Sequence, residues 1–276
     1  MNIFSLISKR KYFLKKTLFS LLCLFVLLFF LFLWEIAVIH YNIPKRILPK
    51  PTDIGIYLMH EFFSVHRIGY ESIVSKTLSS FFDAFTGFII SAVLGSMIGI
   101  IFGKNYIFHL IFFPIIFLTQ LVPLPAFAPV VAAIFGYDIT TKIIIIVLFT
   151  IFPVIVNVEK AVHNITFDHI SLFKTYNASS AHEFLKLILP SIIPNLLLTL
   201  KIISTASFVA SIVSELSLTT SGGIGKDIFT SFNNQIIPRV WSSLIIVSFI
   251  SLVYYWAITR FEQYILETYH YGKNEQ

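Results

Sequence analysis

The 276-residue sequence has little charge and almost no cysteine. Charged residues make up 12% of the chain, 57% of its residues are hydrophobic, and the mean hydropathy is +0.85. A soluble domain of this size would need a far more charged surface, so the composition excludes a soluble globular protein. The single cysteine, Cys23, cannot form an intrachain disulfide and lies in an apolar run, where it would pack as a small hydrophobe.

Catalytic and nucleotide-binding motifs are also missing. No HExxH, CxxC or GxSxG pattern occurs, and the histidines between residues 163 and 182 lack metal-ligand spacing. The segment 221–227 approaches a phosphate-binding loop but fails the pattern, because no glycine stands five residues before Gly225 and Asp227 replaces Ser or Thr. We therefore predict no catalytic residue, no metal site, no cofactor and no ATPase activity in this chain. The modest net charge of +6 fits membrane anchoring better than nucleic-acid binding.

Long apolar runs dominate what is present. A hydrocarbon core of about 30 Å needs about 20 apolar residues per helix, and strand-length alternating segments are absent. The sequence therefore predicts an all-α polytopic membrane protein with about six transmembrane helices. The predicted spans cover residues 18–39, 72–102, 106–135, 141–158, 192–215 and 240–260.

Positive charges predict the orientation of these spans. A dense cluster precedes the first span and consists of Lys9, Arg10, Lys11, Lys15 and Lys16. This cluster indicates a retained first helix with its N-terminus in the cytoplasm, and six spans then place both termini inside. We divide the chain into a cytoplasmic segment 1–16, a single transmembrane domain 17–265 and a cytoplasmic tail 266–276. Loop 40–70 lies outside, with a short surface helix around Ile54–Phe63, and Lys142 also falls on the outside in this count.

The second predicted span has a small residue at every fourth position. These residues are Gly87, Ser91, Gly95, Gly99 and Gly103. They lie close to one helix face, which lets another backbone approach closely. We predict a helix-packing face, with a moving interface along a pathway as the alternative.

Prolines interrupt the third predicted span at positions 114, 123, 125 and 129. Irregular backbone at membrane depth is tolerated only against protein or a water-filled cavity. Segment 119–129, with Gln120, Pro123 and Pro125, is therefore a candidate lining of a pathway; a kinked packing helix is the alternative.

Apart from lysines counted with the outside segments, the ionisable residues that we place in the spans or at their edges are Asp83, Glu159, Lys201 and Glu215. Glu159 and Lys201 lie near the cytoplasmic boundary, where they can reach water. Asp83 and Glu215 are candidates for the lining of a pathway or for a gate, since charges at membrane depth are costly. The alternative for each carboxylate is a structural pairing or contact with water near the outer half of the span.

The longest polar interruption in the second half of the chain is Ser171–Pro190, within the cytoplasmic segment 165–190. It predicts two short helices with a turn at Asn177, because Asn tolerates the left-handed conformation. Ser180 and Glu183 have the spacing of a capping box that would start the second helix. A folded hairpin between two spans is suited to binding another protein.

The second of these short helices is expected to be amphipathic. Its apolar face would consist of Phe184, Leu187 and Ile188. Pro190 is predicted to end the helix, because proline cannot donate the backbone hydrogen bond that would continue it.

The segment Ser171–Pro190 resembles the cytoplasmic coupling loop of permease subunits of bacterial ABC importers. That loop has Glu-Ala-Ala, a glycine four residues later and an Ile-x-Leu-Pro ending. Residues 187–190, Leu-Ile-Leu-Pro, fit the ending, and Ala178 follows the turn as in many relatives. Asn177 stands at the glycine position, and residues 171–173, Ser-Leu-Phe, stand where Glu-Ala-Ala is expected. The first half of the loop therefore departs from the pattern.

Other segments resemble the same family in order and spacing, over roughly residues 30–260. They are residues 48–51, 86–88, 122–123, 128–129, 135–137, Lys142, 152–157 and 223–225. The set looks closest to the branch that imports nitrate, sulfonates, taurine and the pyrimidine or riboflavin vitamins. Thr119 and Gln120 look more like the vitamin and pyrimidine-precursor permeases.

The resemblance implies a type I ABC importer permease fold in the cell inner membrane, and a transport subunit rather than an enzyme. It implies a second, identical permease subunit, cytoplasmic ABC ATPase subunits that hydrolyse ATP, and an external solute-binding protein. The substrate would be a small organic solute or anion, with a vitamin or pyrimidine precursor favoured. The residues expected to couple the chain to the ATPase are Leu172, Phe173, Asn177, Ala178, Ser180, Glu183, Phe184, Leu187 and Pro190.

Two alternatives remain open from the sequence. A stand-alone ion-coupled secondary transporter would need no ATPase, and its 171–190 segment would be an ordinary loop. A non-transporting relative is suggested by the altered first half of that loop.

Overall fold

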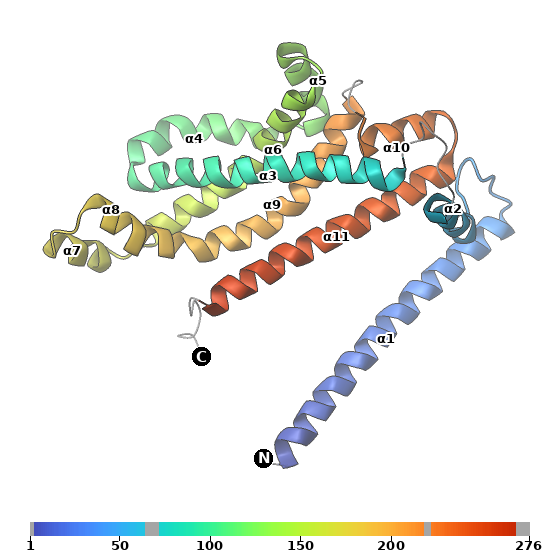
Figure 1. The fold of residues 1–276 in the computed structure, drawn as a ribbon, viewed down its shortest axis with the longest axis horizontal. Helices are drawn as coiled ribbons and strands as arrows, with labels where there is room; N and C mark the ends of the chain where they lie inside the picture. The colour runs from blue at the N-terminus through green and yellow to red at the C-terminus, as the bar shows by residue number, and fades with distance from the viewer. Residues whose placement is uncertain (1–2, 64–71, 218–221, 269–276) are drawn as a thin grey trace. The chain divides into compact units, whose positions relative to one another are not determined.

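The computed structural model describes residues 3–63, 72–217 and 222–268, and all regular structure in these ranges is helical. Five helices are long and apolar enough to cross a membrane, and a bent helix pair makes a sixth candidate. The prediction of an all-α protein with about six spans is therefore confirmed. The helices are α1 (Ile3–His40), α2 (Pro51–Phe63), α3 (Ile73–Lys104), α4 (Tyr106–Leu121), α5 (Leu124–Phe135), α6 (Ile139–His163), α7 (Phe167–Thr175), α8 (Ser180–Glu183), the π-helix η1 (Phe184–Ile188), α9 (Leu189–Ser217), α10 (Ile224–Asn233) and α11 (Ile237–Thr268) (Figure 1).

The chain forms two compact units. The first contains Met1–Val65 and Ser231–Ser242, and the second contains His66–Thr230 and Ser243–Gln276. In the first unit the rings of Trp34 and Trp241 lie 4.9 Å apart, and the Glu35 carboxylate accepts hydrogen bonds from the backbone and the hydroxyl of Thr52. The Glu35–Thr52 hydrogen bonds therefore hold α2 against the end of α1, and the tryptophan pair joins α1 to the start of α11. Helix α1 begins at Ile3, and the cytoplasmic location of segment 1–16 stays a prediction.

The small-residue stripe of α3 lies against α6 in the second unit. A Cβ atom added at Gly87, Gly95, Gly99 or Gly103 would collide with Ile146, Val154, Val158 or Val162, respectively. At the remaining position, the hydroxyls of Ser91 and Thr150 are hydrogen-bonded at 2.7 Å. Each pair is separated by 59 residues, as the Ser91–Thr150 bond illustrates, so α3 and α6 run in the same direction in constant register. Small side chains let the two backbones pack closely along this length.

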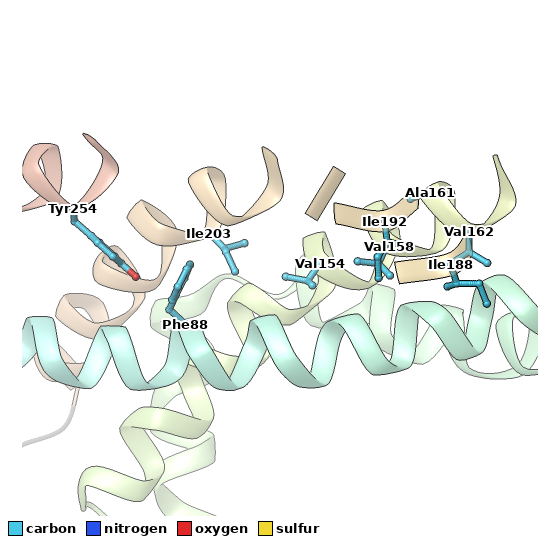
Figure 2. Close-up of a cluster of buried hydrophobic side chains, with 9 residues drawn as sticks. All are labelled: Phe88, Val154, Val158, Ala161, Val162, Ile188, Ile192, Ile203 and Tyr254. Atoms are coloured by element: carbon cyan, nitrogen blue, oxygen red, sulfur yellow. The ribbon is translucent and has the colours of Figure 1, made fainter. Parts of the chain in front are cut away.

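A hydrophobic core joins α3 and α6 to η1, α9 and α11 within the second unit. Figure 2 shows its nine buried residues, which are Phe88, Val154, Val158, Ala161, Val162, Ile188, Ile192, Ile203 and Tyr254. Because η1 contributes Ile188 to this core, the end of the 171–190 segment is part of the packed helical block.

The predicted third span, 106–135, is two helices with a sharp bend. Helices α4 and α5 meet at an angle of 111°, and Pro123 stands at the N-cap of α5. The proline-rich stretch therefore breaks the helix where the sequence indicates. Gln120 does not point into open space, because its side-chain amide donates a 3.2 Å hydrogen bond to the carbonyl of Phe149 on α6.

Candidate functional site

Helices α7 and α8 form the hairpin that the sequence predicts. Asn177 makes the turn with a φ of 48°, and the Ala178 amide donates to the carbonyl of Phe173 at 3.0 Å. Ser179, and not Ser180, is the N-cap of α8: its hydroxyl accepts a 3.3 Å hydrogen bond from the His182 amide. The prediction of Ser180 as the cap is wrong by one residue, because Ser179 has the extended backbone that an N-cap requires.

The apolar residues of the hairpin and of η1, which follows it, divide into an exposed and a buried set. Leu172, Tyr176 and Leu185 are 51%, 78% and 56% exposed. Leu187 is 8% exposed, and Phe184 is partly buried against the hydrophobic core. Phe184 and Leu187 therefore anchor the hairpin to the helical block and do not form its free surface. Phe173 is half-buried, and Leu172 beside it is open to a partner.

Pro190 does not end the second helix, contrary to the prediction. Residues Phe184–Ile188 form a π-helix in which the Leu189 amide donates to the carbonyl of Phe184, five residues back. This shift of hydrogen-bond register accommodates the missing amide of proline, so the helix continues into α9. The apolar stretch from Ser180 to Leu216 is consequently one candidate span of 37 residues.

An ion pair ties the hairpin to the end of α3. Glu183, predicted to belong to a capping box, lies 3.2 Å from the ammonium of Lys104. Figure 1 shows α7 and α8 at the end of the second unit where α3 ends and α4 begins, while α10 lies at its other end.

A buried charge cluster joins three helices at the α10 end of this unit. The Lys142 ammonium on α6 pairs with the carboxylates of Asp83 on α3 and Glu215 on α9. Lys142 is 2% exposed and Glu215 is 1% exposed. The structure thus brings together Asp83 and Glu215 through Lys142, although the charge pattern of the sequence predicts an outside location for this lysine. Asp83 and Lys142 are 59 residues apart, so this pair continues the register of the small-residue stripe.

Glu215 also binds the start of α10. Its Oε2 accepts a 2.7 Å hydrogen bond from the Gly225 amide, and its Oε1 accepts a 2.6 Å bond from Ser80. The Ser80 hydroxyl in turn accepts a 2.9 Å bond from the Ile224 amide. Gly223 lies so close that a Cβ atom there would collide with the Glu215 carboxylate. The glycine segment 223–225, one of the segments that resemble the permease family, is therefore docked on this carboxylate.

Two cavities of about 270 Å³ each lie beside this segment and share Gly222 and Gly223. Their linings differ in charge. The first is lined by Ser79, Asp83, Tyr137, Asp138, Ile139 and Lys142 in addition to the two glycines, so it has two carboxylates against one ammonium. The second contains Lys76, Lys226, Asp227 and Thr230, and its Lys76 and Asp227 are paired at 2.6 Å.

The remaining predicted site residues lie apart from the cluster. Pro123 and Pro125 start α5, whose residues Ala128, Val131 and Ala132 pack on Ile145 of α6. Glu159 lies 2.5 Å from Nδ1 of His109, and Lys201 lies 2.7 Å from Glu262. Within the described part of the chain, no group of three potential ligands is arranged to hold a metal ion.

Comparison of the sequence with known protein families and proteins agrees with this architecture. Residues 91–266 match the model of the family "binding-protein-dependent transport system inner membrane component". The chain is 28% identical over 248 residues to the formylaminopyrimidine transport permease ThiX of Halalkalibacterium halodurans, covering 87% of this chain and 93% of that protein. It is 26% identical to the putative aliphatic sulfonates transport permease SsuC of Bacillus subtilis, covering 74% of this chain and 71% of that one. It is 29% identical to the nitrate import permease NrtB of Leptolyngbya laminosa, covering 60% of each.

The matched region includes the stripe from Ser91 onward, the bent helix pair, the hairpin, Glu215 and the glycine segment. Together with the six candidate spans, this match identifies a multi-pass protein of the inner membrane and a transport subunit, not an enzyme. The chain belongs to the family of binding-protein-dependent transport system inner membrane components.

Proposed function

We propose that this chain is the permease subunit of an ATP-driven importer and that the hairpin α7–α8 couples it to a cytoplasmic ATPase. Two identical copies would form the pathway, each of two ATPase subunits would hold one hairpin, and an external binding protein would deliver the solute. The observation that carries the proposal is the hairpin itself. It presents Leu172 and Tyr176 to solvent, and it continues without a break into α9 through η1, where Leu185 is also exposed.

This construction suits the transmission of force. The hairpin is fixed by the buried Leu187 and Ile188 and by the ion pair between Glu183 and Lys104. A displacement imposed on its exposed face would therefore move α3 and α9, since the contacts leave the hairpin little freedom of its own. Exposed apolar side chains on a segment that is itself anchored by buried residues are typical of a surface that another protein covers.

The experiment substitutes one exposed hairpin residue and follows the ATPase. Leu172→Asp should abolish co-purification of the ATPase with the permease and lower solute uptake at least tenfold, because a charge would be buried unpaired in the contact. Lys174→Asp is the matched control: it adds negative charge to the same helix about 200° away and should leave both measurements near wild type. Both variants should insert in the membrane in normal amount. Normal uptake by Leu172→Asp would contradict the coupling role.

An uptake assay in membrane vesicles distinguishes this proposal from an ion-coupled secondary transporter. Membrane vesicles that contain ATP but no ion gradient should take up the solute. Uptake driven by an ion gradient alone, with no ATPase bound, would instead support the secondary transporter.

For the substrate, we propose a small organic solute with N–H donors, such as a pyrimidine precursor. The cavity beside Asp83, Asp138 and Lys142 has two carboxylates, and its one ammonium is already paired with Asp83 and Glu215. Such a lining attracts donor groups and repels anions. The ThiX relative, a formylaminopyrimidine transport permease, supports this choice. Uptake of a labelled aminopyrimidine, without uptake of nitrate, is the expected result, and the reverse would exclude the class.

A further inference from the structure

The buried cluster of Lys142, Asp83 and Glu215 stands at one end of the α3–α6 interface. The small-residue stripe places every fourth residue of α3 opposite a residue 59 positions later in α6, and Asp83 with Lys142 is the next pair in that register. The packing of the glycines therefore determines where the ammonium and the carboxylate meet. Glu215 brings α9 to the same point.

Besides the ion pair of Lys76 with Asp227, hydrogen bonds to Ser80 and Glu215 connect α10 to α3 and α9. Ser80 accepts a hydrogen bond from the Ile224 amide, and Glu215 accepts one from the Gly225 amide. These amides belong to the first turn of α10, whose own helix offers them no acceptor. Ser80 and Glu215 thus act as the N-cap of α10, supplied by α3 and α9.

We propose that Lys142 is a positioning residue that keeps α10 attached to α3 and α9 by holding the Glu215 carboxylate in place. The carboxylates of Asp83 and Glu215 both contact the Lys142 ammonium, so without it two buried negative charges would face each other. Like charges at such short range repel each other strongly in a buried site. Glu215 would then turn away from Asp83, and α10 would lose the acceptor of its Gly225 amide.

The position of α10 then depends on a residue of α6, through α9. Because α9 continues at its other end into the hairpin, Lys142 would link the position of α10 to the position of the hairpin. This role goes beyond the proposed coupling to an ATPase and does not require it.

The test measures distances within the full-length chain in lipid nanodiscs, in a Cys23→Ser background without other cysteines. Spin labels at Leu198 on α9 and Phe229 on α10, both about half exposed, report the attachment of α10. Labels at Leu198 and Phe82 report the packing of α9 on α3 as the control pair. Labelled chains are diluted with unlabelled chains so that only distances within one chain are recorded.

We expect Lys142→Met to at least double the width of the Leu198–Phe229 distance distribution and to leave the Leu198–Phe82 distribution unchanged. Adding Asp83→Asn should restore the narrow distribution, since a single buried carboxylate, Glu215, then remains to bind α10. This rescue distinguishes charge-dependent positioning from a merely structural contact. Failure of the rescue, an unchanged α9–α10 width in Lys142→Met, or equal broadening of both pairs would overturn the proposal.

A second variant tests the same attachment with Lys142 intact. A Cβ atom at Gly225 would lie 2.8 Å from Cβ of Glu215, whereas one at Gly222 would have no atom within 4 Å. Gly225→Ala should therefore broaden the α9–α10 distribution, and Gly222→Ala should not. An unchanged width in Gly225→Ala would contradict the docking on Glu215, even if Lys142→Met fails to fold. No ATPase is present in these measurements, so their outcome is independent of the test of the hairpin.

Discussion

Replacing Gly99 with alanine should separate α3 from α6. The added Cβ atom would lie 2.7 Å from the backbone carbonyl oxygen of Ile155 and 2.9 Å from Cβ of Val158. Ordinary contact begins at 3.4 Å, so the helices must move apart by about 0.7 Å at this point. The obstacle is backbone and the stem of a β-branched side chain, and neither can move aside by a change of rotamer.

Two opposing effects determine the magnitude. Overpacking of a close helix contact costs about 1–3 kcal/mol. A gap of about 0.7 Å elsewhere along the interface would remove about a quarter to a half of the dispersion energy of each affected contact. Alanine in a helix interior stabilises the helix by about 0.5–1 kcal/mol relative to glycine. The net effect of Gly99→Ala should be a loss of about 1–2 kcal/mol in the free energy of unfolding.

The assay is reversible unfolding in mixed micelles, followed by circular dichroism. Gly55→Ala is the control, because Gly55 lies inside α2 and a Cβ atom there would have no atom within 4 Å. It should show the helix-propensity gain alone, so the two variants should differ by about 1–3 kcal/mol. If Gly99→Ala were as stable as Gly55→Ala, the small residues would not be needed for the approach of α6, and the reasoning from the stripe would fail.

Two further predictions concern the turn of the hairpin and the start of α2. Asn177 has a φ of 48°, so Asn177→Ala should destabilise the hairpin by about 1 kcal/mol, whereas Asn177→Gly should be tolerated. The rate of proteolysis within residues 171–183 measures this difference. Equal cleavage rates in the two variants would show that the left-handed backbone at residue 177 does not strain alanine. The hydrogen bond from Lys45, at 2.7 Å, lowers the pKa of Asp53 below its ordinary value of 3.8. A lowered pKa means that the stabilisation by this pair is complete above 3.8 and is lost as the pH falls through the folded-state value. The carboxyl carbon shift of labelled Asp53 should titrate below 3.8, and Lys45→Met should move the midpoint upward; an unmoved midpoint would exclude the pair as the cause.

The spans and the hairpin turn could be predicted because their signals are local. Each long apolar run specifies a helix whatever its neighbours are, and the four-residue spacing of Gly95 and Gly99 indicates a close-packed face without naming the partner. Asn177 marks a left-handed turn by its own chemistry. The N-cap residue of α8 cannot be chosen from local signals alone, because Ser179 and Ser180 can both cap a helix. The backbone that leaves the Asn177 turn decides between them, since it gives Ser179 the extended conformation.

Lys142 could not be predicted as part of the site, because its partners are distant in the sequence. It follows Asp138 by one helical turn and, read alone, resembles a lysine at the end of a span. Only the α3–α6 register brings it to Asp83, and only the path of α9 adds Glu215. The role of Pro190 could not be predicted for a similar reason. Its effect depends on η1, where the Leu189 amide already reaches five residues back.

The two ends of α3 are held by different ionic contacts, and this limits how the second unit can move. Lys104 ties one end to the hairpin through Glu183, and Asp83, about 30 Å along the helix, ties the other region to α9 through Lys142. A helix fixed at both points to the same continuous partner, α8–η1–α9, cannot slide along it without breaking one ion pair. Because Glu215 and Lys142 are buried, the break at that end would leave a charge unpaired and be the costlier of the two. The 0.7 Å displacement expected in Gly99→Ala arises between these ties, so it must be absorbed at the exposed Glu183–Lys104 end, nearest the hairpin.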